Sequence, residues 1–238
     1  ADSTGARDIW TGAALSQSAG TFGEGILIGI IDSGIDLDNP SFAAVGPVDG
    51  YVHTNPFGEG QYVGLGDPNH PDFDASLVFN SKVVGAYDFT DDTVFNDTAF
   101  ADHGTSVAGI AAGNFVNVTI PGTTTTTEIS GVAPHANIIS YDVCDSNDGC
   151  SNVAIVAAVD QASINGVDVI NMSIGGPTQS PWSGVMAQAM WKAHEAGIFV
   201  AVSAGNEGPG AETLSAPADA PWVTAVAAGR VGEETQVR

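Results

Sequence analysis

Four short apolar runs, rich in valine and isoleucine, recur along the chain with helical segments between them. They occupy residues 26–31, 137–143, 167–173 and 198–203. Runs of this length without alternating polar positions are typical of strands buried on both faces, as in a parallel sheet. Strand–helix–strand repetition requires right-handed crossovers that place helices on the faces of the sheet. The sequence therefore predicts an α/β protein, a three-layer α/β/α fold with a mainly parallel sheet.

Capping signals mark two of the intervening helices. Ser151 precedes a helical segment at 152–164 that ends at Asn165 and Gly166. Ser180 followed by Pro181 resembles an N-cap with proline at the first helical position, which predicts a second helix running to about residue 196. Gly197 would end that helix, because glycine readily adopts the left-handed conformation found after helix C-termini.

Two segments interrupt this alternation. Residues 43–80 are rich in glycine, proline, asparagine and aspartate, and predict a long surface excursion. Residues 114–128 contain five consecutive threonines and predict an exposed loop or hairpin. We interpret both as surface insertions in one incomplete domain that covers residues 1–238.

The charge balance is strongly acidic. Twenty-eight aspartates and glutamates face five lysines and arginines, for a formal net charge of −23. Such a chain repels nucleic acids and anionic lipid surfaces, so neither is expected as a partner. No stretch reaches the ~20 apolar residues that a membrane-spanning helix needs. Solubility in salty or calcium-containing surroundings is the simplest interpretation, and an acidic surface for basic partners is the alternative.

Cys144 and Cys150 are the two cysteines, separated by a turn rich in asparagine, aspartate and glycine. Their spacing suits a small disulfide loop, whereas in a reducing cytosol they would be two thiols. A pair five residues apart is a poor zinc site unless other ligands join it. The disulfide interpretation favours an oxidising compartment.

Three polar side chains stand where ligand sites form in open α/β sheets, at or near strand ends. Asp32 follows the first apolar run, Asn206 follows the run at 198–203, and His103 begins a segment of small residues. A carboxylate can orient a histidine, and a side-chain amide can donate to a developing oxyanion. Taken alone, each residue more often has a structural role or belongs to an ordinary turn.

Taken in order, the motifs resemble those of the subtilisin-like serine proteases, or subtilases. They are Asp-Ser-Gly at 32–34, His-Gly-Thr at 103–105, Gly-Val-Ala-Pro-His-Ala at 131–136, Val-Ile-Asn-Met-Ser-Ile-Gly at 169–175 and Ala-Gly-Asn at 204–206. The cysteine pattern further resembles the larger subtilases, which include plant cucumisin-like enzymes and their bacterial relatives. The resemblance implies a secreted serine endopeptidase with an Asp-His-Ser triad and a disulfide, Cys144–Cys150, beside the substrate cleft.

The resemblance also implies a role for each matching residue. Asp32 would orient the imidazole, His103 would act as general base and then general acid, and Asn206 would stabilise the oxyanion. The walls of the primary specificity pocket would be Ser173, Ile174 and Gly175 on one side, with Ala204 and Gly205 on the other. Gly149 and Ser151, with Cys150 between them, would be the segment that pairs with substrate residues as an added strand.

One family motif does not occur in the 238 residues. The nucleophile of the family lies in Gly-Thr-Ser-Met-Ala, and Gly104-Thr105-Ser106 belongs instead to the histidine motif. We expect the serine, and an inserted domain, after residue 238, so the remaining C-terminal part of the catalytic domain is an expected partner. The chain by itself is predicted to be inactive. The alternative function is a non-catalytic module that binds peptides, and an unrelated hydrolase or dinucleotide enzyme is disfavoured by the missing Gly-x-Ser-x-Gly and Gly-x-Gly-x-x-Gly motifs.

No cofactor or metal is assigned. Asp36, Asp38 and Asp49 are candidates for a calcium site of the kind that subtilases often have. The other four histidines lack ligand-like spacing and are interpreted as structural. The four tryptophans are expected to be core or helix-packing residues. Glu207, directly after Asn206, is predicted to border the primary pocket and to favour polar or basic side chains there.

Overall fold

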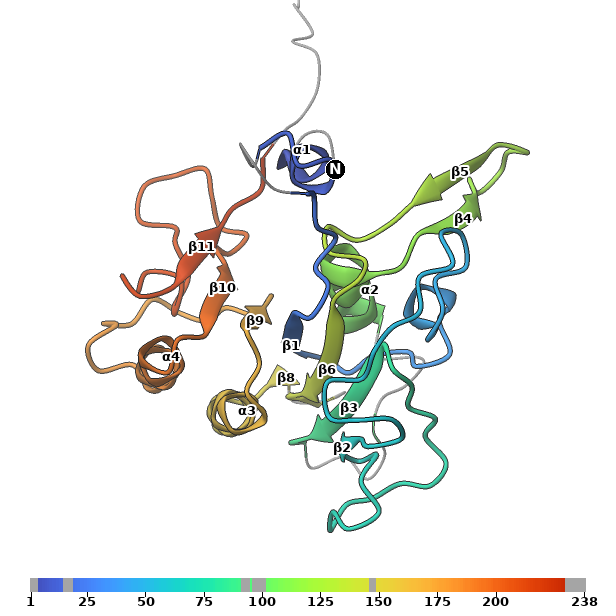
Figure 1. Ribbon diagram of the computed structural model, residues 1–238. Helices are drawn as coiled ribbons and strands as arrows, with labels where there is room; N and C mark the ends of the chain where they lie inside the picture. The colour runs from blue at the N-terminus through green and yellow to red at the C-terminus, as the bar shows by residue number, and fades with distance from the viewer. Residues whose placement is uncertain (1–3, 15–18, 91–94, 96–101, 146–148, 230–238) are drawn as a thin grey trace, which may run out of the picture.

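A computed structural model describes residues 4–14, 19–90, 95, 102–145 and 149–229 of the chain. Seven strands form one sheet in the order β11-β10-β9-β1-β6-β3-β2 (Figure 1), and every neighbouring pair is parallel. The strands are β1 (Leu27–Asp32), β2 (Val63–Gly64), β3 (Val83–Asp88), β6 (Asn137–Asp142), β9 (Val169–Met172), β10 (Phe199–Ser203) and β11 (Thr224–Val226). The four predicted strands are thus confirmed as β1, β6, β9 and β10.

Helices pack against both faces of the sheet. One face packs against α2 (Asp102–Ala112), and the other against α3 (Asn152–Asn165) and α4 (Val185–Glu195) (Figure 1). Side chains of β1 alternate between the two cores, with Ile28 and Ile30 on the α2 side and Leu27 and Ile31 on the other. This alternation explains why the strand is apolar throughout, and it confirms the three-layer α/β/α fold.

Smaller elements complete the described chain. They are α1 (Ala6–Trp10), the 3₁₀ turn η2 (Pro40–Phe42), the hairpin β4 (Val116–Thr119) with β5 (Thr126–Ile129), and the pair β7 (Cys144–Asp145) with β8 (Gly149–Cys150). The exposed hairpin expected in residues 114–128 is therefore confirmed. No helix in the described ranges combines the length and the apolar character needed to cross a bilayer.

The start of α4 differs from the prediction. Ser151 caps α3 as expected, its hydroxyl accepting from the Val153 amide at 3.3 Å, and Gly166 ends that helix with φ 70°. By contrast, α4 begins at Val185 rather than after Ser180. The Ser180 carbonyl accepts from the amides of Ser183 and Gly184, which closes a tight turn before the helix. The Ser-Pro signal therefore marks that turn, and Gly184 is the N-cap.

The 43–80 segment is more than the surface excursion that its composition predicts. It contributes β2, which extends the sheet beyond β3 at one edge. It also buries Leu65 and Phe79 in the core on the α2 side, as well as the polar His53 and Asn55. Its scattered apolar residues are therefore part of the fold, because they cover the end of the sheet.

The tryptophans are only partly core residues. Trp222 is buried and donates its ring N–H to the Ala187 carbonyl at 2.7 Å, which ties the start of β11 to α4. Trp191 packs edge-on against it with ring centroids 4.6 Å apart. Trp182 contacts Trp222 and also Trp191 of α4 but remains 68% exposed, so it packs against a helix without being a core residue.

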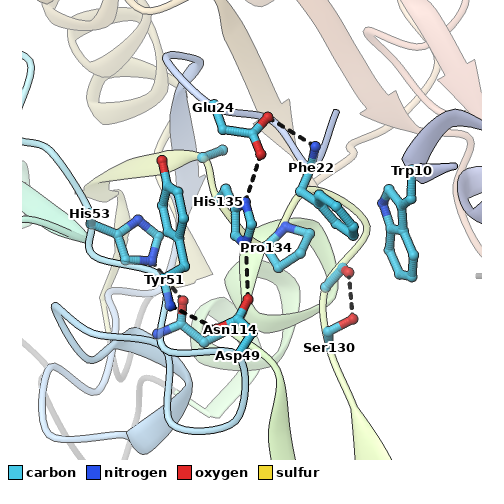
Figure 2. A network of polar contacts seen from close by, with 12 residues as sticks. Trp10, Phe22, Glu24, Asp49, Tyr51, His53, Asn114, Ser130, Pro134 and His135 are labelled. Carbon is cyan, nitrogen blue, oxygen red and sulfur yellow. Dashed lines mark hydrogen bonds and ion pairs between the residues drawn. The ribbon is translucent and has the colours of Figure 1, made fainter. Parts of the chain in front are cut away.

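His135 connects three segments that are distant in sequence. Figure 2 shows its ring between two carboxylates, with Nδ1 2.7 Å from Glu24 and Nε2 2.8 Å from Asp49. Tyr51 stacks on the ring, with centroids 3.7 Å apart and planes 5° apart. The structural interpretation of His135 is therefore supported, and Asp49, one of the calcium candidates, is committed to this contact.

Candidate active site

The proposed site residues gather at one edge of the sheet because the strands are parallel and in register. Ile31 of β1 lies opposite Met172 of β9, and Met172 lies opposite Val202 of β10. The next residue along each strand, Asp32, Ser173 or Ser203, therefore reaches the same carboxyl edge. Binding sites of open α/β sheets form at this edge.

Asp32 and His103 are in direct contact although 71 residues separate them in sequence. His103 Nδ1 lies 2.7 Å from Asp32 Oδ1. The carboxylate side chain is 1% exposed, whereas the imidazole side chain is 64% exposed. A buried carboxylate bonded to Nδ1 fixes the ring and selects the tautomer that leaves Nε2 free to accept a proton. A pair with this geometry can act chemically as a positioned base.

Further contacts hold the start of α2 against the turn after β1. The Ser33 hydroxyl bonds Asp32 Oδ1 at 3.3 Å and accepts from the Gly104 amide at 3.2 Å. Thr105 accepts from the Asp36 amide at 2.8 Å. A Cβ on Gly104 would collide with the Gly34 carbonyl oxygen, so only glycine permits this approach. The small residues of the histidine motif therefore set the position of the ring.

A second group of predicted residues lines a cavity of about 520 Å³ at the same edge of the sheet. Ser173 and Gly175 lie on one wall, and Gly205 and Asn206 on the other. The Asn206 side chain is exposed and has no hydrogen-bond partner among the described residues. Its amide is therefore free to donate to a bound group. Gly205 has φ 96°, a left-handed conformation that glycine adopts without strain.

The base of this cavity is the segment 212–215, which the sequence did not identify. Residues 176 and 216 form an antiparallel bridge, and the Ser215 amide donates to the Ala204 carbonyl at 3.1 Å. These bonds join the segment to both walls. No local motif marks it, because its place depends on pairing with residues about 10 and 40 positions earlier.

Gly149 and Ser151 line a separate cavity of about 500 Å³ together with Phe89 and Thr90. The disulfide Cys144–Cys150 closes the β7–β8 pair beside it, as one of the two sequence interpretations expected. Val143, which lines this cavity, donates its backbone amide to the Asp32 carbonyl at 2.9 Å and so joins the cavity to the Asp32–His103 pair. Ile174 instead packs against the core, and Ala204 lines a neighbouring cavity.

Comparisons with known proteins agree with these observations. The model of the Subtilase family matches residues 23–236. From Arabidopsis thaliana, subtilisin-like protease SBT1.5 is 35% identical over 90% of this chain and 27% of its own length, and subtilisin-like protease SBT2.2 is 34% identical over 87% and 25%. Subtilisin-like protease SBT3.17 is 36% identical over 87% of this chain and 28% of its own. The chain belongs to the subtilase family, and it spans about a quarter of the length of these curated relatives.

Proposed function

We propose that the protein containing this chain is a secreted serine endopeptidase, and that the chain supplies two members of its Asp-His-Ser triad. The observation that carries the proposal is the 2.7 Å contact between buried Asp32 and exposed His103. The family membership and the names of the relatives, all subtilisin-like proteases, support it. The serine is proposed to lie in a part of the protein outside these 238 residues, since the chain covers only about a quarter of the length of these relatives.

The proposed mechanism assigns each residue one step. His103 Nε2 takes the proton from the serine hydroxyl as it attacks the peptide carbonyl, and later delivers it to the leaving amine. Asp32 holds the ring through Nδ1 and stabilises the imidazolium that forms. Asn206 donates to the oxyanion of the tetrahedral intermediate, where charge develops only during the reaction.

Substrate binding is proposed to use the two cavities. The side chain preceding the cleaved bond would enter the 520 Å³ cavity between Ser173, Gly175 and Gly205. The upstream backbone would pair as an added strand near Gly149 and Ser151. The Cys144–Cys150 disulfide braces that segment and fits an oxidising, extracellular setting.

The direct test is kinetic, on the full-length protein with an internally quenched peptide. Asp32→Asn should lower kcat about 10⁴-fold, because the ring loses its orienting carboxylate. Asn206→Ala should lower kcat about 10²–10³-fold, the range known for removing such a donor from a subtilisin. Asp36→Asn is the control, since only the Asp36 backbone amide contacts α2. Normal turnover in Asp32→Asn would refute the assignment.

The position of the nucleophile needs a separate test. The 238-residue chain should show no labelling by a fluorophosphonate probe, whereas the full-length protein should be labelled at one serine. Labelling of the shorter chain at a single site, blocked by His103→Ala, would place the nucleophile inside it and contradict the proposal.

A further inference from the structure

We infer that the 520 Å³ cavity selects a basic substrate side chain, and that Glu207 and Glu212 are the specificity-determining residues. The inference rests on the proposed function, since it names the substrate class for the same site. Glu212 lies outside every motif identified in the sequence.

The charge of the cavity has one sign. Thirteen described residues line it, and Glu207 and Glu212 are the ionisable ones among them. Neither carboxylate has a hydrogen bond or an ion pair with any described residue, and both residues are exposed. Two unpartnered carboxylates on one cavity lining attract a cation and repel an acidic side chain.

The floor of the cavity is polar. The Ser215 hydroxyl oxygen is fully buried and has no hydrogen-bond partner among the described residues. A Cβ placed on Gly205 would lie 2.8 Å from that oxygen, and one on Gly175 would also collide with it. The hydroxyl therefore lies between the two wall glycines. A buried hydroxyl without a partner is costly, so this part of the lining is poorly suited to an apolar ligand.

The backbone of Glu212 has an unusual conformation. It has φ 58°, the left-handed region, and is the non-glycine residue with positive φ in the described ranges. A side chain with a Cβ is disfavoured there, and glycine would occupy the position without strain. A non-glycine residue kept in this conformation on a cavity lining favours a functional role for its side chain.

A long basic side chain matches this arrangement better than an apolar one. Its methylene stem would pass the glycine walls, while its N–H donors bind the carboxylates of Glu207 and Glu212. An apolar side chain would displace water from both carboxylates without replacing its hydrogen bonds. An acidic one would add a third negative charge to the same cavity.

The kinetic test uses the full-length protein and peptides that differ only in the residue before the cleaved bond, either arginine, leucine or glutamate. The wild type should cleave them with kcat/KM in that order. Glu207→Gln combined with Glu212→Gln should lower the arginine-to-leucine ratio of kcat/KM about fivefold. This is the effect expected when a bound cation loses its interactions with two solvent-exposed charges. Glu128→Gln is the matched control, because Glu128 lies on the exposed β5 strand away from the cavity lining. An unchanged ratio in the double variant would overturn the inference.

A binding test separates this inference from the proposed function. Benzamidine, a cation, and benzamide, its neutral analogue, are titrated into the same protein while backbone amide signals are followed by NMR. Benzamidine should shift the signals of Gly175, Gly205 and Ser215, and benzamide should shift them much less. Equal shifts with both probes would overturn the inference even if peptides are cleaved. Selective benzamidine binding without any peptide cleavage would support it while the proposed function fails.

Discussion

Lys82 is fully buried, and this has a consequence for stability that can be measured. Its ammonium donates to the carbonyls of Pro134 and Ala136 at 2.8 and 2.6 Å, on either side of His135. No described carboxylate lies within ion-pair distance of it. Burial lowers the pKa of Lys82 from 10.5 to about 7, and the more distant charge of Asp49 opposes this only in part. The folded protein therefore holds this proton less tightly than the unfolded chain does.

The sign of the pH effect follows from this difference. Between pH 7 and 10.5 the unfolded chain binds more protons at this position, so the free energy of unfolding rises with pH. With 1.36 kcal/mol for each tenfold change in proton affinity, the rise from pH 7 to 9.5 is about 3 kcal/mol. Burial also raises the pKa of Tyr87 and Tyr141, so the measurement should stop below their titration.

Lys82→Met removes the charge and keeps a similar side-chain length. Its two carbonyl partners lose their donor at every pH, which lowers stability by about 1–3 kcal/mol each without a pH trend. The difference between wild type and variant should therefore change by about 3 kcal/mol from pH 7 to 9.5, in favour of the wild type. Urea unfolding followed by circular dichroism at constant ionic strength measures this difference.

Lys192→Met is the matched control for that experiment. Lys192 is 72% exposed in an ion pair with Glu195 on α4, so its removal should leave the pH profile parallel to that of the wild type. A Lys82→Met profile that also runs parallel to the wild type over this range would refute the argument.

Three further outcomes are expected. Burial opposes the shift, but hydrogen bonds with Thr21 and His135 help to hold the pKa of Glu24 at about 2. The stability that the Glu24 carboxylate contributes is therefore lost as pH falls from 4.5 through 2. Glu24→Gln should flatten that part of the acid unfolding curve. Gly104→Ala should destabilise the protein by about 2–3 kcal/mol in urea unfolding, because the new Cβ collides with the Gly34 carbonyl oxygen. Gly109→Ala has open space at its Cβ and should stabilise the protein by about 0.5–1 kcal/mol. Ser151→Ala should cost about 1 kcal/mol in the same assay, through loss of the α3 N-cap.

Local patterns were sufficient for the parts of the fold that depend on neighbouring residues. The buried strands were recognised from their apolar runs, and α3 from a capping serine and a terminal glycine. Where a local signal had two interpretations, the prediction was less accurate. Ser180 and Pro181 fit a helix start as well as a turn, and only the backbone bonds to Ser180 distinguish them.

The sequence by itself determined the family and the order of the motifs, because each motif is a short stretch whose residue types carry the signal. It also named Asp32, His103 and Asn206 as candidates. Only the tertiary structure decided that Asp32 contacts His103 across 71 positions, that Ser215 lies between Gly175 and Gly205, and that residues 63–64 become an edge strand. These features depend on strand register and on packing between distant segments, and such long-range contacts leave no periodic or local trace in the sequence.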